Sequence, residues 1–175
     1  DSMLHAGAEQ VVIVLGYRAE EIKKVLLQTE TDKRGQLLFA YNHNPMETDM
    51  LFSIQSGLAA MPICDAFFLL PGDMPLVADT TFLELLQVRE QTGASLVFPC
   101  INGRRKHPPL IDYHLIPLIC SYTGENGLRG VWIQYETQHP EQIREIAVTD
   151  QGCMTDIDTS DDYHRITHKK EVDVR

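Results

Sequence analysis

Apolar runs alternate with amphipathic stretches along the whole chain. The runs at 11–15 and 66–70 are uninterrupted and rich in β-branched or aromatic residues, as is typical of strands buried on both faces of a parallel sheet. Further strands are expected at 37–41, 95–99, 106–111 and 143–148. Apolar residues at helical spacing predict helices at 19–27, 50–60, 79–91, 115–120, 128–134 and 160–169.

This alternation predicts an α/β fold, a three-layer, Rossmann-like arrangement with a mostly parallel sheet and helices on both faces. Ligands of such sheets bind beyond the carboxyl ends of the strands. The helix at 79–91 has Asp79 or Thr80 as its expected N-cap. No repeat or linker interrupts the pattern, so we expect one domain over residues 1–175.

Composition and charge limit the classes of partner that this chain is expected to bind. The chain has 175 residues, a formal net charge of -10, 43% hydrophobic and 23% charged residues, which is typical of a folded globular domain. The acidity weighs against a nucleic-acid partner, and no apolar stretch approaches the roughly 18 residues of a membrane span. A cytoplasmic location is expected. The four cysteines form no CxxC pair, so buried free thiols are expected.

A carboxylate follows the most apolar strand. Asp73 lies just past the run at 66–70, where Gly72 allows the backbone to turn. Mg²⁺ binds one or two carboxylates together with phosphate oxygens, so Asp73 would supply half of a metal site. The spacing alone leaves open a second reading, in which Asp73 caps a turn.

The second half of that site is expected at 156–163. Asp156 and Asp158 alternate, so in an extended segment they point the same way. At least one of Asp161 and Asp162 is explained by the favourable position of an acid at a helix N-terminus. Two carboxylates that converge on Mg²⁺ can orient a triphosphate for nucleotidyl transfer.

Three segments together resemble a known family. The stretches 70–75 (LPGDMP), 106–111 (KHPPLI) and 156–163 (DIDTSDDY) occur in the order and spacing of the MobA-like NTP-transferase family. The likeness is closest to its molybdenum cofactor cytidylyltransferase branch. Residues 6–16 are similar to the second strand of that family and its lead-in, and 42–58 to the segment beside its nucleotide.

The resemblance implies a role for each candidate residue. Asp73 and Asp158 would bind Mg²⁺ beside the triphosphate, with His107 as a third catalytic residue facing the acceptor. On the nucleotide side it implies Asn42, Ser53, Gly72 and Asp73. The role of His107 has an alternative, in which it is a hydrogen-bonded histidine of a strand. Arg129 is the implied ligand of the acceptor phosphate, and its alternative is a solvated arginine at the start of a helix.

The chain departs from the family pattern in two places. Asp49 stands where related sequences carry glycine, and the glycine-rich loop that opens the family is not found within residues 1–175. The first β-α unit of the family is therefore expected to be missing here, which would leave a gap or an exposed strand edge in the sheet. A homodimer could cover such an edge. Without the loop, binding of a triphosphate is expected to be weak.

Three functions follow from these residues. The first is transfer of a nucleoside monophosphate from CTP, or another NTP, to a small phosphorylated acceptor such as molybdopterin. The second, from a different class, is a non-catalytic remnant that binds a ligand or partner without turnover. The third keeps the reaction and replaces the acceptor by a sugar phosphate.

Overall fold

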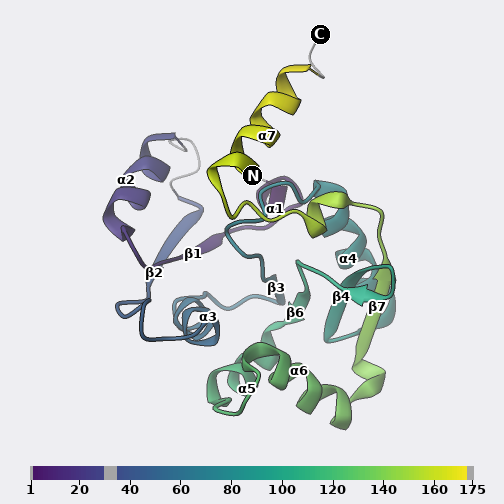
Figure 1. The fold of residues 1–175 in the computed structure, drawn as a ribbon. Helices are drawn as coiled ribbons and strands as arrows, with labels where there is room; N and C mark the ends of the chain where they lie inside the picture. The colour runs from purple at the N-terminus through teal and green to yellow at the C-terminus, as the bar shows by residue number, and fades with distance from the viewer. Residues whose placement is uncertain (1, 30–34, 173–175) are drawn as a thin grey trace.

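The computed structural model describes residues 2–29 and 35–172 (Figure 1). Its helices are α1 (Ser2–His5), α2 (Ala19–Thr29), α3 (Met50–Ala59), α4 (Asp79–Thr92), α5 (Ile116–Ser121), α6 (Gly127–Gln138) and α7 (Ser160–Val172). Its strands are β1 (Val11–Leu15), β2 (Leu37–Tyr41), β3 (Ala66–Phe68), β4 (Leu96–Ile101), β5 (Arg104–Arg105), β6 (Leu110–Asp112) and β7 (Ile143–Ala147). Short 3₁₀ turns lie at Tyr113–Leu115, Pro140–Gln142 and Gln151–Met154.

The strands form two sheets. β1 and β2 make a parallel pair of their own, with Val11 opposite Leu37. In the larger sheet β6 lies between β3 and β4 and runs antiparallel to both, while β7 pairs parallel with β4. The α/β class is confirmed. The expectation of a mostly parallel sheet is wrong, because this larger sheet is largely antiparallel.

A tight turn explains the reversed strands. Asn102 and Gly103 both have positive φ, 52° and 70°, which is the geometry of a two-residue hairpin between β4 and β5. The chain then returns through β6 against the direction of β4. Because β3 and β4 are both antiparallel to β6, they still run in the same direction, and β7 follows them.

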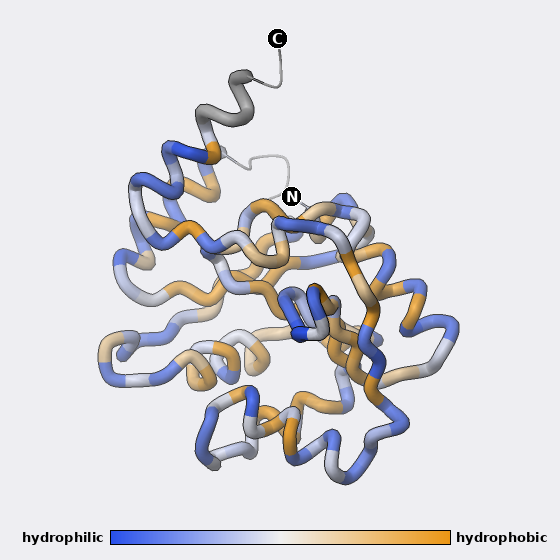
Figure 2. The backbone as a smooth tube through the Cα atoms, turned by 45° about the vertical axis from the view of Figure 1, so that its right-hand side comes forward, coloured by the Kyte–Doolittle hydropathy of each residue, from blue (hydrophilic) through white to orange (hydrophobic). Residues whose placement is uncertain are grey.

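Helices cover both faces of the larger sheet. Along β4, Leu96 and Phe98 face a core shared with α3, α5 and α6, while Val97 between them faces α4. Phe82 of α4 packs edge-on against Phe68 of β3 at a ring separation of 4.9 Å. This is a three-layer arrangement, and Figure 2 shows the apolar segments inside it with hydrophilic stretches on the outer turns.

The strands β1 and β3, which lie at the edges where the two sheets face each other, are less buried than their sequences predict. In β1 only Leu15 is fully buried, and in β3 only Phe67 is. Both strands line one cavity of about 2280 Å³. The prediction that both are buried on both faces is therefore wrong, although each is a strand at the expected place. Each strand has one hydrogen-bonded neighbour among the described residues.

Helix α4 begins with a cap that comes from a distant part of the chain. Its N-cap is Ala78, which offers no side-chain hydrogen bond, so the expectation of Asp79 or Thr80 is wrong. Instead the Asp150 carboxylate accepts hydrogen bonds from the Ala78 amide and the Thr81 hydroxyl, both at 2.8 Å. These bonds tie the segment after β7 to the start of α4.

All four cysteines are free thiols, but they differ in exposure. Cys100 and Cys153 are buried, and burial is the main cause that raises the pKa of each to about 11. Cys64 is half-buried and Cys120 is exposed, so the expectation of burial holds for only two of the four. Within residues 2–29 and 35–172, no helix is both long and apolar enough to cross a bilayer.

Candidate functional site

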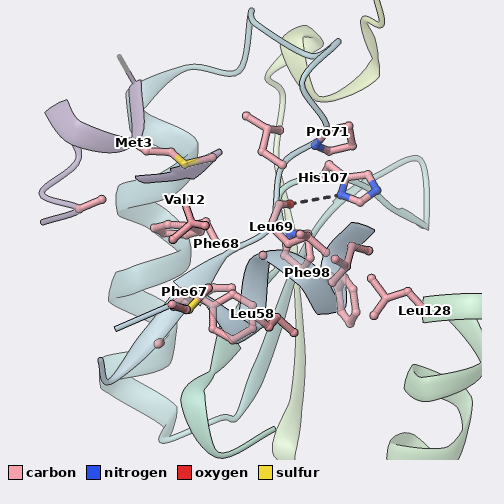
Figure 3. Close-up of a pocket in the computed structure, with 18 of the residues that line it drawn as sticks. Met3, Val12, Leu58, Phe67, Phe68, Leu69, Pro71, Phe98, His107 and Leu128 are labelled. Carbon is pink, nitrogen blue, oxygen red and sulfur yellow. Dashed lines mark hydrogen bonds between the residues drawn. The ribbon is translucent and has the colours of Figure 1, made fainter. Parts of the chain in front are cut away.

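Five of the predicted site residues line the same cavity. They lie on the segment after β3, on α3, before β6 and at the start of α6, and are Ser53, Gly72, Asp73, His107 and Arg129. Figure 3 shows this cavity with His107 beside Leu69 and, across the space, Leu128 of α6. The predicted positions are therefore brought together from segments that are more than 70 residues apart in sequence.

The antiparallel strand β6 is what brings His107 to the site. Phe68 at the end of β3 pairs with Leu110 at the start of β6, so the residues before β6 lie at the carboxyl end of β3. There the Leu69 amide donates to the Pro109 carbonyl at 3.2 Å, and the His107 Nδ1 lies 3.4 Å from the Leu69 carbonyl oxygen. The peptide bond between His107 and Pro108 is cis.

The two predicted metal ligands belong to adjacent segments. The Ile157 amide donates to the Asp73 carbonyl at 2.8 Å, which joins the turn after β3 to the acidic segment 156–158. Asp73 and Asp158 are both exposed. A Cβ at Gly72 would meet no atom within 4 Å, so the space beside Asp73 is open to a ligand.

The donor chemistry of this pair suits a hard divalent cation. Carboxylate oxygens are the protein ligands that Mg²⁺ and Mn²⁺ use beside substrate phosphates. In the part of the chain that the structure describes, no group of three His, Cys, Asp or Glu side chains is placed to hold a metal. A cation at Asp73 and Asp158 would thus take its remaining ligands from substrate and water.

Asn42 is hydrogen-bonded to Ser53 and does not line the cavity itself. The Asn42 side chain is 4% exposed, and its Nδ2 donates to the hydroxyls of Thr48 at 2.8 Å and Ser53 at 2.9 Å. Its Oδ1 accepts from the Asn44 amide at 3.0 Å. With these bonds Asn42 orients Ser53, which lines the cavity, whereas Asn42 itself does not.

Two acids that flank the candidate site serve helix ends. Asp49 is the N-cap of α3 and accepts from the Phe52 amide at 2.9 Å. Asp162 accepts from the Thr159 amide at 2.9 Å, and the Thr159 hydroxyl accepts from the Asp162 amide in return. This reciprocal pair begins α7, so the explanation of Asp162 by the helix N-terminus is confirmed.

Arg105 is a half-buried residue of the cavity lining that the sequence analysis did not single out. It donates to both Glu136 oxygens at 2.7 and 3.0 Å and to Glu145 at 2.6 Å, and its guanidinium lies 4.6 Å from the Phe98 ring centre. The hydrogen bond from Arg105 is the main cause that lowers the pKa of Glu145. Its position two residues before His107 was the available signal.

Three further cations at the cavity have no ion-pair partner among the described residues. Arg104, Lys106 and Arg129 line it, and among the described residues none of them lies within ion-pair distance of a carboxylate. Because Arg105 is bound by two carboxylates and Arg89, which also lines the cavity, is paired with Asp112, these three side chains are the arginines and lysines of the described lining that are available to a ligand anion.

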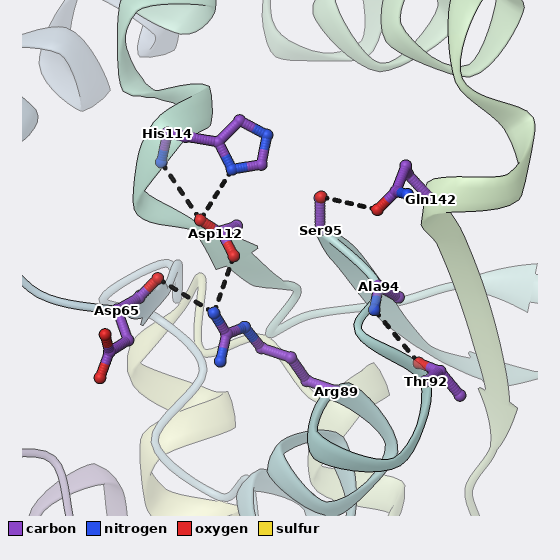
Figure 4. Close-up of polar contacts among 8 residues, drawn as sticks. All are labelled: Asp65, Arg89, Thr92, Ala94, Ser95, Asp112, His114 and Gln142. Atoms are coloured by element: carbon purple, nitrogen blue, oxygen red, sulfur yellow. Dashed lines mark hydrogen bonds and ion pairs between the residues drawn. The ribbon is translucent and has the colours of Figure 1, made fainter.

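A second polar cluster lies at the opposite end of the larger sheet (Figure 4). Arg89 donates to the Asp112 carboxylate at 2.7 Å and to the Asp65 carbonyl at 3.2 Å, and His114 Nδ1 lies 2.8 Å from Asp112. Asp112 pairs with Ala66, the first residue of β3, so the cluster is remote from the carboxyl end where Asp73 lies. It fastens α4 to β6.

The family follows from a direct comparison. The model of the family described as "MobA-like NTP transferase domain" matches residues 1–140 of this chain. The chain belongs to the MobA-like NTP transferase family. The resemblance noted in the sequence is therefore confirmed at the level of the family, and the cytidylyltransferase branch remains a prediction.

Relatives and solved structures agree with the MobA-like assignment. The mannose-1-phosphate guanylyltransferase catalytic subunit beta of Drosophila pseudoobscura pseudoobscura is 34% identical over 95 residues, 53% of this chain and 24% of that protein. The bifunctional protein GlmU of Carboxydothermus hydrogenoformans is 29% identical over 96 residues, 54% of this chain and 19% of that protein. The chain thus spans less than a quarter of the length of either curated relative.

Two solved proteins share the fold. Rv0371c of Mycobacterium tuberculosis H37Rv matches with a TM-score of 0.69 and 24% identity, covering 95% of this chain and 80% of that one. The same protein was also solved in complex with manganese. A nucleotidyl transferase from Methanothermobacter thermautotroptrophicus matches with a TM-score of 0.71 and 18% identity, covering 94% and 74%. The α/β fold of this MobA-like chain is therefore that of known nucleotidyltransferase structures.

Proposed function

We propose that this chain carries the catalytic site of a nucleotidyltransferase, which transfers a nucleoside monophosphate from an NTP to a small phosphorylated acceptor. The observation that supports it most is the hydrogen bond between the Ile157 amide and the Asp73 carbonyl. It joins the acidic segment 156–158 to the turn at Asp73. Asp73 itself lines one cavity with His107 and three cations that have no ion pair among the described residues. Carboxylates can bind a divalent cation and free arginine or lysine side chains can bind phosphate oxygens, so this set of residues suits a metal–triphosphate complex.

In the proposed reaction, an oxygen of the acceptor phosphate attacks the α-phosphorus of the NTP. A new P–O bond forms there, and the bond to the β-phosphate oxygen breaks, so pyrophosphate leaves with that electron pair. No covalent enzyme intermediate is needed, and the protein contributes position and charge. Ser53, held by Asn42, is proposed to lie beside the base or ribose, with Gly72 leaving room for the phosphates.

The remaining residues divide between metal and acceptor. Asp73 and Asp158 would hold one Mg²⁺, which supplies positive charge against the triphosphate. His107 and Arg129 are proposed to face the acceptor phosphate, with Lys106 and Arg104 as nearby cations. The manganese complex of Rv0371c supports a divalent cation in this fold.

Two acceptors are proposed, a first candidate and a second. The likeness of segments 70–75 and 106–111 to the cytidylyltransferase branch favours CTP with molybdopterin. The 34% identity to a mannose-1-phosphate guanylyltransferase supports a sugar phosphate, with GTP, as the second candidate. Both share a phosphate nucleophile, so the proposed residues have the same roles in each.

The test is transfer of label from α-³²P-CTP or α-³²P-GTP at millimolar concentration, with Mg²⁺ and either molybdopterin or mannose 1-phosphate. We expect labelled product and pyrophosphate only when nucleotide, Mg²⁺ and acceptor are all present, and at a low rate, because the glycine-rich loop that holds the triphosphate is not found within residues 1–175. Asp158→Asn should slow transfer by about 100-fold or more, as for removal of other charge-stabilising groups. The matched control Asp161→Asn, an exposed acid in the first turn of α7, should keep the wild-type rate. Binding of nucleotide without transfer to any acceptor would instead support the non-catalytic alternative.

A further inference from the structure

Two runs of the chain that are far apart in sequence lie side by side next to the candidate site. One is residues 73–81, the turn after β3 with the start of α4, and the other is residues 150–158, which follow β7. At one end of this contact the Ile157 amide donates to the Asp73 carbonyl, and at the other end Asp150 caps α4. The paired runs therefore lie antiparallel to each other.

The Asp150 carboxylate fixes one end of the paired runs. Its Oδ2 accepts from the Ala78 amide and the Thr81 hydroxyl, and its Oδ1 accepts from the Gly152 amide, all at 2.8 Å. Thr81 is 2% exposed, so its hydroxyl has little access to water in place of this bond. Both oxygens of one side chain thus join the start of α4 to the opposite run.

The middle of the paired runs is too close for a side chain at position 152. A Cβ at Gly152 would overlap the Leu76 carbonyl oxygen and would lie 2.7 Å from the Val77 amide nitrogen. The next residue, Cys153, is 1% exposed and packs in a core with Met74 and Val77. The backbones touch directly here because position 152 is glycine.

Asp158 lies at the far end of this contact, between two anchored neighbours. Before it, the Ile157 amide is bound to Asp73 at 2.8 Å, and after it, the Thr159 amide is bound to Asp162 at the start of α7. The Asp158 side chain itself is exposed. The place of its carboxylate is therefore set by the backbone on either side, and that backbone is aligned by the paired runs.

We propose that Asp150 and Gly152 are positioning residues of the candidate site. They fix the register of the paired runs and so direct the Asp158 carboxylate toward Asp73. In an extended chain successive side chains point to opposite sides, so a slip of one residue would turn this carboxylate away. The inference rests on the proposed function, in which the two aspartates share one cation, but neither Asp150 nor Gly152 lines the cavity.

Gly152→Ala is the main test, because it adds one methyl group at the closest point of the paired runs and changes no charge. By nuclear magnetic resonance, the Ile157 amide should exchange hydrogen at least tenfold faster relative to the amides of Leu96 to Phe98. By electron paramagnetic resonance, the affinity of the folded variant for Mn²⁺–CTP should fall at least tenfold. The matched control is Gly35→Ala, since Gly35 also lacks a left-handed φ and a Cβ there meets no atom within 4 Å. It should change neither quantity.

A second pair of variants tests the Asp150 end without added bulk and decides the question if Gly152→Ala does not fold. Thr81→Val removes the hydroxyl that donates to Asp150, whereas Thr81→Ser keeps it. We expect Thr81→Val to speed exchange at Ile157 and weaken Mn²⁺–CTP binding at least threefold, and Thr81→Ser to restore both. A lower unfolding temperature with unchanged exchange at Ile157, or with unchanged affinity, would overturn the proposal.

The two proposals fail in different ways. A wild-type protein that does not bind Mn²⁺–CTP would contradict the proposed function. Exchange at Ile157 needs no nucleotide, so it would still decide whether Gly152 and Asp150 hold the acidic segment in register. A wild-type protein that binds Mn²⁺–CTP, with Gly152→Ala and Thr81→Val binding equally well, would contradict the positioning role alone.

Discussion

At the scale of single residues, polar side chains around the site are held by partners from other segments. Asn42 uses three of its hydrogen-bonding positions on Thr48, Ser53 and Asn44, and Asp150 uses its oxygens on α4 and on the turn at Gly152. Buried polar groups with several partners stabilise one arrangement strongly, because losing one group leaves its partners unsatisfied.

Asn42→Ala should destabilise the protein by about 2 kcal/mol, since it leaves the Ser53 hydroxyl and the Asn44 amide without their present partner. The measurement is urea unfolding followed by circular dichroism. The control is Asn44→Ala, because Asn44 takes part through its backbone and its side chain is exposed. A loss for Asn42→Ala no larger than for this control would contradict the role assigned to Asn42.

The lowered pKa of Asp150 leads us to expect that the stability of the protein depends on pH. Burial opposes its ionisation, but hydrogen bonds from the Ala78 amide, the Thr81 hydroxyl and the Gly152 amide outweigh burial and lower its pKa below the ordinary 3.8. A lowered folded pKa stabilises the protein above the unfolded pKa, and this contribution is lost as pH falls through the folded value. Asp150→Asn should therefore cost about 1 to 3 kcal/mol at pH 7 and progressively less below pH 3.8. Unfolding free energies of both proteins at pH 7 and pH 3 test this, and an equal difference at the two pH values would refute it.

At the scale of elements, Arg105 joins four of them. It lies on β5 and binds Glu136 of α6 and Glu145 of β7 while its guanidinium stacks on Phe98 of β4. These contacts fix α6, which carries Arg129, against the strand that leads to His107. The two carboxylates are each more than a third exposed, so solvent weakens the attraction.

Arg105→Ala should lower stability by about 1 kcal/mol and speed hydrogen exchange in α6, because the ion pairs and the packing on Phe98 are both lost. Arg104→Ala is the matched control, since Arg104 is exposed on the same strand and has no described ion pair. Thermal unfolding and exchange of the α6 amides are the readouts. Equal behaviour of the two variants would show that Arg105 does not hold α6.

The positions of helices and strands could be predicted where the local sequence pattern determines them. Features that depend on contacts between distant segments, such as the direction of a strand in the sheet, could not. The uninterrupted runs predicted β1 at its observed bounds, and the periodicity of 50–60 predicted α3 within a residue. The direction of β6 depends on the hairpin at Asn102 and Gly103, which the polar turn signalled without fixing where the returning strand would pair. The cap of α4 depends on Asp150, which is 72 residues from Ala78.

At the scale of the whole molecule, the β1–β2 pair is attached to the rest mainly through α3, which packs on both of its strands and on α5 and α6. The close packing of Gly57 on Val14 shows how tight the first of these contacts is, since a Cβ there would lie 2.7 Å from the valine. The larger sheet, by contrast, has helices on both faces.

This asymmetry predicts uneven local stability. Amides of Val12 to Val14 should exchange at least tenfold faster than those of Leu96 to Phe98, because β4 is buried throughout and paired on both edges while β1 is paired on one. Hydrogen exchange of the free protein measures both sets at once. Equal protection of the two strands would mean that the β1–β2 pair does not open separately.

The site itself was predictable to the extent that strand ends gather at one edge of a sheet. Asp73 and the segment around Asp158 are 85 residues apart in sequence, and the Ile157–Asp73 hydrogen bond makes their segments neighbours as the pattern indicated. Arg105 was missed because its importance depends on Glu136 and Glu145, whose approach no spacing announces. Asn42 was chosen as a nucleotide contact, whereas its contacts in the structure are to Thr48, Ser53 and Asn44.

The proposed site requires that Asp73 and Asp158 share one divalent cation with a nucleoside triphosphate. Electron paramagnetic resonance of Mn²⁺ in the presence of CTP measures this directly, because bound and free Mn²⁺ differ in signal. Asp73→Asn and Asp158→Asn should each lower the affinity for Mn²⁺–CTP at least tenfold, while Asp161→Asn should leave it at the wild-type value and all three should unfold at similar temperatures. Unchanged affinity in both Asp73→Asn and Asp158→Asn would show that these carboxylates do not share a cation with the nucleotide.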